Sequence, residues 1–313
     1  MTLGSSPVDM TAQVGSLTLP APVMTAAGTA GHGAELSAYV DLSSIGAVVV
    51  KSLSAEPWEG NAAPRVHQTP AGMLNSVGLQ GPGIPAWIRD DLPKLTRHGA
   101  RVVVSIWGRS VDDYERAARA LQPAEASLTA VEINLSCPNL DGGAHLFAHD
   151  PVATTEVLSA TKSLSVPRWA KLSPNTDRVT EVAAAAHQAG AEAVTLINTV
   201  MGMIIDTEHR RPLLGGGSGG LSGAAIHPVA VRTVYEVRRA LPDLPLVGVG
   251  GVSDAVTAVE LLLAGANAVQ VGTATFADPR SVTKIIEGLR TWCEDRGVTS
   301  VRDLVSGAHH VAR

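Results

Sequence analysis

The sequence predicts an α/β fold, a TIM (β/α)8 barrel with a small β-hairpin at its N-terminal end. Three observations lead to this prediction. Short β-branched runs alternate with stretches of helical period along the 313 residues, and apolar strands separated by helices indicate a parallel sheet covered by helices. Eight such units over about 250 residues are enough to close a barrel. Only 3% of the residues are aromatic while 45% are apolar, so the core is built from small aliphatic side chains.

Each predicted strand is a short apolar run. The eight strands are Pro22–Ala26, Ala47–Lys51, Arg101–Ile106, Val131–Leu135, Arg168–Leu172, Ala193–Ile197, Leu246–Val249 and Ala268–Val271. Helical period follows in VDDYERAARAL, PVATTEVLSATKSL, DRVTEVAAAAHQAG, PVAVRTVYEVRRAL and SDAVTAVELLLAGA. Residues typical of helix N-caps are Ser110, Asp150, Asp177 and Ser253, and glycines typical of helix ends are Gly99, Gly190 and Gly265.

A doubly wound open sheet is the competing arrangement. It usually has a G-x-G-x-x-G turn after its first strand. The corresponding segment here, AAGTAGHG, has a different glycine spacing, so we favour the barrel. The segment QVGSLTLP, before the first strand, predicts a hairpin that plugs the barrel floor.

The glycine-rich run GGGSGG at 215–220 resembles an interdomain linker. As a linker it would leave a C-terminal piece with only two predicted strands. We therefore interpret it as a mobile loop between the sixth and seventh strands, and we expect residues 1–313 to form one barrel domain.

Composition excludes several classes of function. The net charge is −5, the pI is about 6.0 and no basic block occurs, which argues against nucleic acid or an anionic membrane as a partner. The N-terminus lacks the pattern of a signal peptide, and no apolar run is long enough for a membrane span. Two cysteines are too few for a disulfide framework or an iron–sulfur cluster. We expect a cytoplasmic protein without a metal site.

Two consecutive glycine turns predict a phosphate site. Gly250 and Gly251 follow the seventh strand and precede a helix, and Gly272-Thr273 repeats the arrangement after the eighth. Glycines allow backbone N–H groups to approach an anion, and a helix N-terminus favours negative charge. Tight turns that need a positive φ are the alternative for either turn alone.

Two lysines end predicted strands. A buried lysine is costly unless it is paired, so Lys51 and Lys171 either form structural salt bridges or face bound anions. We favour an anionic cofactor for one and an anionic substrate for the other.

The turn after the fourth strand contains the thiol of Cys137 between Asn134 and Asn139. A buried structural thiol is inert, but an apolar core would reject these polar neighbours, so we predict a functional thiol. Asn75 and Asn198 bring to four the amides available to one pocket. Amides both donate and accept hydrogen bonds and suit a heterocycle with N–H and C=O edges, although each Asn taken separately is a typical turn residue.

In its ordered motifs the chain resembles class 1 dihydroorotate dehydrogenase, a flavin enzyme of pyrimidine synthesis. The matching segments are AAGTAGHG, KSLSAEPWEGNAAPRV, GMLNSVGLQGPG, NLSCPN, KLSPN, INTVMGM, GGLSGAAIHPVA, GVGGV and VGTA. INTVMGM and GGLSG are more similar to the class 1B catalytic (FMN) subunit than to class 1A.

The resemblance implies that residues 1–313 form a single FMN-binding barrel domain, and it implies a set of site residues. The FMN-binding residues it implies are Ala27, Lys51, Ser52, Ser105, Asn134, Lys171, Ile197, Gly223, Gly250, Gly251, Gly272 and Thr273. The substrate-binding residues are Lys51, Asn75, Ser76, Val77, Gly78, Leu79, Asn134, Asn139, Asn198 and Thr199. Cys137 matches the catalytic base, which removes a proton from dihydroorotate while hydride passes to FMN. Ala27 stands where the family often has Ser, and Ser105 where it often has Asn.

The resemblance to class 1B also implies partners. Members of that subclass pass electrons to NAD through a separate subunit that carries FAD and an iron–sulfur cluster. A homodimer of this chain within a heteromeric complex is the expected assembly.

Other functions are compatible with the same residues. One alternative is a related FMN barrel enzyme that acts on another dihydropyrimidine, such as dihydrouracil. A second is a flavin-free barrel enzyme that uses Cys137 as a nucleophile. A third, a non-catalytic docking subunit, would have no need of Cys137, Lys51 and four asparagines.

Overall fold

The computed structural model describes residues 8–136 and 147–309. In this part of the chain, eight parallel strands form one sheet in the order β3-β16-β15-β10-β9-β8-β7-β4. Their bounds are β3 Val23–Thr25, β4 Val48–Val49, β7 Val102–Ile106, β8 Ala130–Asn134, β9 Arg168–Leu172, β10 Ala193–Leu196, β15 Leu246–Val249 and β16 Ala268–Val271. The two edges meet, because Gly46 N–H donates to Val23 O (2.8 Å) and Thr25 N–H to Ala47 O (3.2 Å). The predicted barrel is confirmed, each strand overlapping its predicted range.

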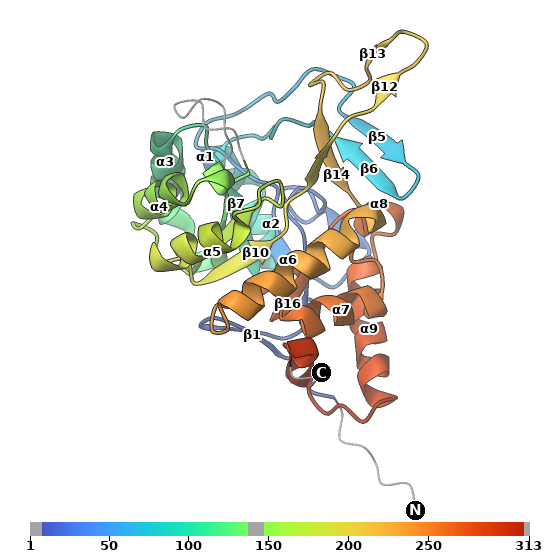
Figure 1. Ribbon diagram of the computed structural model, residues 1–313. Coiled ribbons are helices and arrows are strands. Elements are labelled where there is room, and N and C mark those ends of the chain that lie inside the picture. Colours follow the sequence, from blue (N-terminus) through green and yellow to red (C-terminus); the bar gives the residue numbers. More distant parts are fainter. Residues whose placement is uncertain (1–7, 137–146, 310–313) are drawn as a thin grey trace, which may run out of the picture.

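Helices surround the barrel (Figure 1). The α-helices are α1 Ile84–Asp90, α2 Leu92–Arg97, α3 Val111–Leu121, α4 Pro151–Ala160, α5 Val179–Gln188, α6 His227–Ala240, α7 Ala255–Ala264, α8 Ala274–Ala277 and α9 Ser281–Glu294. The 3-10 helices are η1 Glu35–Ala38, η2 Gln122–Ser127, η3 Phe147–His149, η4 Ala224–Ile226, η5 Val301–Leu304 and η6 Gly307–His309. Among the described residues, none of the helices has the length and apolar character needed to cross a membrane.

The predicted hairpin closes the floor of the barrel. Strands β1 (Ala12–Val14) and β2 (Leu17–Leu19) pair antiparallel with Ala12 opposite Leu19. Their buried side chains form one apolar cluster with inward residues of the barrel strands, among them Val103, Trp169 and Val247. Because the floor is sealed by apolar side chains, the opposite end of the barrel remains for polar chemistry.

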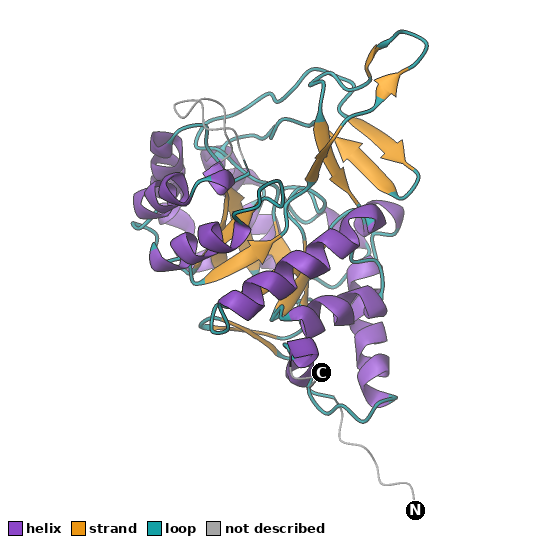
Figure 2. Cartoon of the chain, in the orientation of Figure 1, coloured by secondary structure: helices purple, strands orange, loops and turns teal. Residues whose placement is uncertain are grey.

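A four-stranded antiparallel sheet stands beyond the opposite end of the barrel (Figures 1 and 2). Its order is β11-β14-β6-β5, with bounds β11 Val200–Gly202, β14 Gly219–Ser222, β6 Gly72–Asn75 and β5 Val66–Thr69. A two-stranded ribbon, β12 (Ile205–Asp206) with β13 (Arg211–Pro212), extends from it. The run 215–220 indeed lies between the sixth and seventh barrel strands, but its last two glycines open β14, so treating all of it as loop was wrong.

Helix caps agree with the sequence at two of the four predicted positions. The side chain of Ser110 accepts from Asp113 N–H, and that of Asp150 accepts from Val152 N–H. The prediction was off by one residue at the others. Helix α5 begins after Arg178 rather than Asp177, without a side-chain cap. Helix α7 is capped by Asp254, one residue after Ser253, because Asp254 forms a reciprocal capping box with Thr257.

Candidate active site

The inward side chains of the barrel change from apolar to polar along the strands. On β8, Ala130 belongs to the floor cluster, whereas Glu132 and Asn134, two and four residues further on, face the same interior. On β9, Trp169 belongs to the floor and Lys171 lies one layer higher, paired in register with Asn134. The carboxyl ends of the strands therefore surround a polar mouth, the position of active sites in barrels of this kind.

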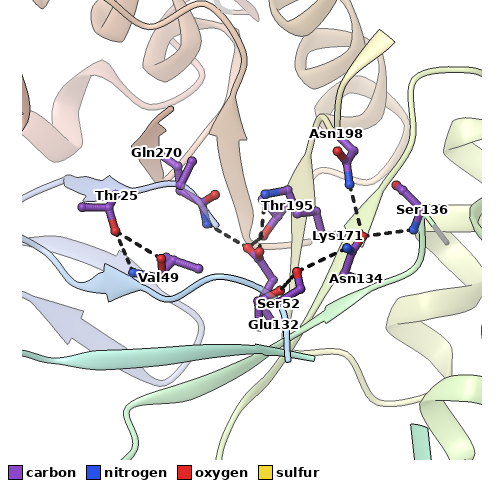
Figure 3. Close-up of polar contacts among 12 residues, drawn as sticks. Thr25, Val49, Ser52, Glu132, Asn134, Ser136, Lys171, Thr195, Asn198 and Gln270 are labelled. Atoms are coloured by element: carbon purple, nitrogen blue, oxygen red, sulfur yellow. Dashed lines mark hydrogen bonds and ion pairs between the residues drawn. The ribbon is translucent and has the colours of Figure 1, made fainter. Parts of the chain in front are cut away.

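A chain of hydrogen bonds at the mouth links β7 and β8 to the segments that follow β4 and β10 (Figure 3). Ser105 and Ser52 share a hydrogen bond between their hydroxyls of 2.8 Å. Asn134 Nδ2 donates to Ser52 Oγ (3.3 Å), and Asn198 Nδ2 donates to Asn134 Oδ1 (3.1 Å). Four predicted site residues are thus in direct contact. Tyr114 on α3 fixes the end of β8, since its hydroxyl donates to Asn134 O (2.7 Å).

Lys171 has a buried carboxylate beside it. Its Nζ lies 3.4 Å from Oε1 of Glu132, with side chains 7% and 0% exposed. The second carboxylate oxygen accepts from Gln270 Nε2 (2.8 Å) and Thr195 Oγ1 (3.1 Å). Sequence reasoning left open whether Lys171 forms a salt bridge, and one is present. It missed Glu132, although an acidic residue in step with Asn134 within an apolar strand was the available signal.

Lys51 differs from Lys171 because no carboxylate of the described residues lies within 4.0 Å of its ammonium. It follows β4 and is half-buried. Burial, and to a smaller extent the positive charge of Arg65, lowers the pKa of the Lys51 ammonium below its ordinary value. A partly desolvated cation without a counter-charge is suited to an anionic ligand.

The predicted phosphate turns converge with a third glycine. Gly223, Gly250 and Gly251 have φ values of 96°, 136° and 68°, which favour glycine. A Cβ on Gly251 would lie 2.9 Å from Gly223 O, so these two turns touch. Thr273 Oγ1 donates to Ser222 Oγ (2.7 Å), which brings the Gly272-Thr273 turn to the same place.

The sequence predicted that the N-terminus of the helix after Gly251 would contribute to the phosphate site, and this differs in the structure. Helix α7 starts four residues after Gly251, and Asp254 accepts the N–H of Thr257 (2.9 Å). Its N-terminus is therefore occupied by its own cap. The groups available to an anion are instead the backbone N–H groups of the glycine turns, and the short helix α8 begins directly after Thr273.

The remaining flavin-site candidates lie next to these turns. Ile197 is buried, its N–H donates to Val249 O (2.8 Å), and a Cβ on Gly250 would lie 3.4 Å from Ile197 Cγ1. Ala27 follows Ala26, whose N–H donates to Val271 O (2.8 Å) directly before Gly272. Both candidates are therefore at the carboxyl end of the barrel.

Strand β14 joins the substrate-loop candidates to the barrel. Asn75 Nδ2 donates to Gly220 O (3.2 Å), and Thr199 Oγ1 lies so close to Gly220 that a Cβ there would clash with it. Thr199 N–H donates to Asn198 Oδ1 (2.7 Å). The pairing of β6, β14 and β11 thus assembles Asn75, Thr199 and Asn198, which are far apart in sequence.

The loop from Ser76 to Leu79 is held by the segment before β5. Asn61 Nδ2 donates to Ser76 Oγ (3.0 Å), Asn61 N–H to Val77 O (3.1 Å), and Trp58 Nε1 to Gly78 O (2.9 Å). Leu79 has a φ of 61°, uncommon for a residue with a Cβ. The loop is therefore preformed.

Asn175 is a further site residue that sequence reasoning did not single out. Its Nδ2 donates to Thr199 O (3.0 Å), and its Oδ1 accepts from Met201 N–H (2.9 Å). It ties the end of the sixth barrel strand to the segment after β9. The motif KLSPN contains it, and its position after a strand end was the available signal.

Two predicted site residues, Cys137 and Asn139, lie outside the described residues. The described chain leads up to them at Ser136, whose N–H donates to Asn134 Oδ1 (3.2 Å). The same amide oxygen accepts from Asn198, so the last described residue before Cys137 is anchored to the hydrogen-bonded chain at the mouth.

Comparison with known proteins gives concordant results. The family model described as Dihydroorotate dehydrogenase matches residues 10–292. A Desulforudis audaxviator protein named "Dihydroorotate dehydrogenase B (NAD(+)), catalytic subunit" is 45% identical over 297 residues, 95% of this chain and 96% of the relative. Proteins of the same name from Geotalea uraniireducens and Alkaliphilus metalliredigens are 44% and 43% identical, over 95% of this chain and 97% and 98% of theirs.

Proposed function

Because this chain belongs to the dihydroorotate dehydrogenase family, we propose that it oxidises (S)-dihydroorotate to orotate with FMN, in the de novo synthesis of pyrimidines. The observation that carries the proposal is the polar mouth, where Asn134 and Asn198 are linked to each other and Lys51 has no counter-charge among the described side chains. Amides match the N–H and C=O edges of the pyrimidine, and a lysine matches the substrate carboxylate.

The residues at the mouth fit FMN. The positive-φ turns at Gly223, Gly250 and Gly251, with Gly272 and Thr273 beside them, suit its phosphate. Ser52, Ser105, Asn134 and Lys171 offer polar groups to its ring, while Ala27 and Ile197 offer apolar contact. FMN, when bound, supplies the hydride acceptor for the oxidation.

We assign the proton transfer to Cys137. As the base it takes the proton at C5 of the substrate, which the adjacent carbonyl acidifies. A general base acts over about 3 Å, so the anchoring of Ser136 by Asn134 matters for its placement. Asn75, the loop 76–79, Asn139, Asn198 and Thr199 are proposed to orient the ring relative to Cys137 and Lys51.

We further propose that the chain acts as one barrel domain, as a homodimer in the cytoplasm, and with a second subunit that relays electrons to NAD. The relatives are named catalytic subunits of an NAD(+) enzyme, and two cysteines are too few for this chain to hold an iron–sulfur cluster alone.

Anaerobic mixing of the FMN-loaded chain with dihydroorotate tests the proposal. We expect the visible absorbance of the flavin to bleach without any partner subunit, and we expect dihydrouracil to be a far poorer reductant because it lacks the carboxylate that pairs with Lys51. A flavin that dithionite bleaches but dihydroorotate does not would overturn the assignment, and preference for dihydrouracil would favour the alternative substrate.

Replacing Lys51 with methionine is expected to weaken orotate binding about ten- to a hundredfold, because this change in affinity corresponds to the free energy of a hydrogen bond to a charged group. Only the ammonium form pairs with the carboxylate. The affinity of the unmodified protein should therefore be complete below the lowered pKa of Lys51 and fall as the pH rises through it, before the roughly 10.4 of a free lysine is reached.

Calorimetric titration of orotate across this pH range checks the Lys51 prediction, after FMN content has been verified. Lys94→Met is the matched control, since Lys94 is exposed on α2 and pairs with Asp91 (2.8 Å). Equal orotate affinity in Lys51→Met and the unmodified protein would contradict a carboxylate contact.

A further inference from the structure

We propose that Glu132 is a positioning residue that acts through Lys171 and sets the reduction potential of the flavin. This inference rests on the proposed function, because it requires FMN at the mouth above Lys171. Glu132 is a fully buried carboxylate in the middle of β8, and three side chains from β9, β10 and β16 converge on it. Figure 3 shows Lys171, Thr195 and Gln270 directed toward it.

The two oxygens of Glu132 have different environments. Oε2 accepts from Gln270 Nε2 (2.8 Å) and Thr195 Oγ1 (3.1 Å), two neutral donors. Oε1 is buried and accepts no hydrogen bond from the described residues, and its cationic neighbour is Lys171 Nζ at 3.4 Å. The two neutral donors hold Oε2 in place, and Oε1 faces the Lys171 ammonium.

Glu132 and Lys171 come from different levels of the barrel strands. In the register of β8 and β9, Lys171 is opposite Asn134, whereas Glu132 is opposite Trp169 of the floor. The backbone position of Glu132 is therefore nearer the floor than that of Lys171. An anion held 3.4 Å from the Lys171 ammonium weakens the positive field of that ammonium at the proposed flavin ring.

Stability alone does not account for this arrangement. A buried ion pair is often no more stabilising than apolar side chains of similar volume, and the layer below is entirely apolar. The pair does have an electrostatic effect on a neighbouring redox group. Reduction adds negative charge to the flavin, Lys171 favours that charge, and Glu132 limits how strongly.

Replacing Glu132 with glutamine tests the inference in the FMN-loaded protein. Gln keeps the shape and an oxygen for Thr195 and Gln270 but removes the negative charge, so the flavin potential should rise. We expect at least a tenfold change in the two-electron equilibrium, about 30 mV. Anaerobic titration with dithionite and reference dyes measures it, which requires no turnover of dihydroorotate. A variant that is folded and binds FMN with an unchanged potential would overturn the proposal.

Two further comparisons separate positioning from a general effect of charge. Glu192→Gln is the matched control at the barrel floor, where Glu192 accepts from Ser16 Oγ (2.8 Å), and its flavin potential should equal that of the unmodified protein. In a Lys171→Met background, Glu132→Gln should shift the potential much less than in the unmodified protein. An equal shift in both backgrounds would show that Glu132 does not act through Lys171.

A second variant covers the case in which Glu132→Gln does not fold. Gln270→Leu removes one donor to Oε2 and leaves both charges in place. The negative charge of Glu132 then has one hydrogen-bond donor fewer, so the reduction potential of the flavin should fall. No shift in Gln270→Leu would count against the proposal. If dihydroorotate failed to bleach the flavin of the unmodified protein, the assigned substrate would be wrong. The dithionite titrations would still test the role of Glu132, because they do not use dihydroorotate.

Discussion

Changing Cys137 to serine should leave FMN bound and lower kcat at neutral pH by roughly 10²- to 10⁴-fold, the usual contribution of a general base. A free thiol ionises near pH 8.5, so a small shift makes it a competent base under physiological conditions. A serine hydroxyl does not ionise in this range. The loss should therefore be largest near neutrality and smaller at high pH, where hydroxide replaces the missing base.

Stopped-flow reduction of FMN by dihydroorotate under anaerobic conditions isolates this step from reoxidation. Cys293→Ala is the matched control for loss of a thiol. Cys293 is 0% exposed on α9, in the core between helices and strands, and burial raises the pKa of its thiol. We expect this variant to reduce FMN at the normal rate. A Cys137→Ser protein that reduces FMN as fast as the unmodified protein would remove the thiol from the mechanism.

The barrel was predictable because its elements are encoded locally. Each strand is a short apolar run that is buried on both faces, as in Val102–Ile106, where every residue is buried. The floor hairpin was equally visible, since a glycine turn separates two short apolar segments at 12–19. Cap positions were less exact. Ser253 and Asp254 are both good N-cap residues, and only the reciprocal bond to Thr257 selects Asp254.

The sheet above the mouth was not predictable in the same way. Strand β14 is mainly glycine and serine, without an apolar alternation, and its partner β6 lies nearly 150 residues away in the chain. Its pairing depends on the barrel that brings the two segments together. For the same reason the sequence offered Asn75 and Thr199 as separate candidates but gave no sign that Gly220 connects them.

Glu132 was not predicted as a site residue because it stands inside an apolar strand, before the polar residues at the strand end. The alternation Val131, Ile133 and Leu135 identified the face that packs on the helices, and Glu132 with Asn134 therefore had to face the interior. A charged residue inside a closed barrel requires a partner. Lys171, on the neighbouring strand β9, was the available cation for this carboxylate.

Replacing Lys171 with alanine should have two measurable effects of different origin. It leaves Glu132 buried without its cation, and breaking a buried pair costs about 3–5 kcal/mol of unfolding free energy. It also removes a cation from the proposed flavin site, which should weaken FMN binding or slow its reduction about ten- to a hundredfold. Urea unfolding of the FMN-free protein isolates the first effect, because a bound ligand would itself stabilise the fold.

The two effects separate in a double variant. In Lys171→Ala combined with Glu132→Gln the unpaired charge is gone, so most of the lost stability should return, whereas the flavin defect should persist because the cation is still missing. Lys162→Ala, at an exposed lysine after α4, is the matched control and should change neither property. Recovery of normal FMN affinity and reduction rate together with stability would mean that Lys171 serves only to neutralise Glu132. Persistence of the flavin defect in a restored fold would separate a lysine that contacts the cofactor from one that only balances a charge.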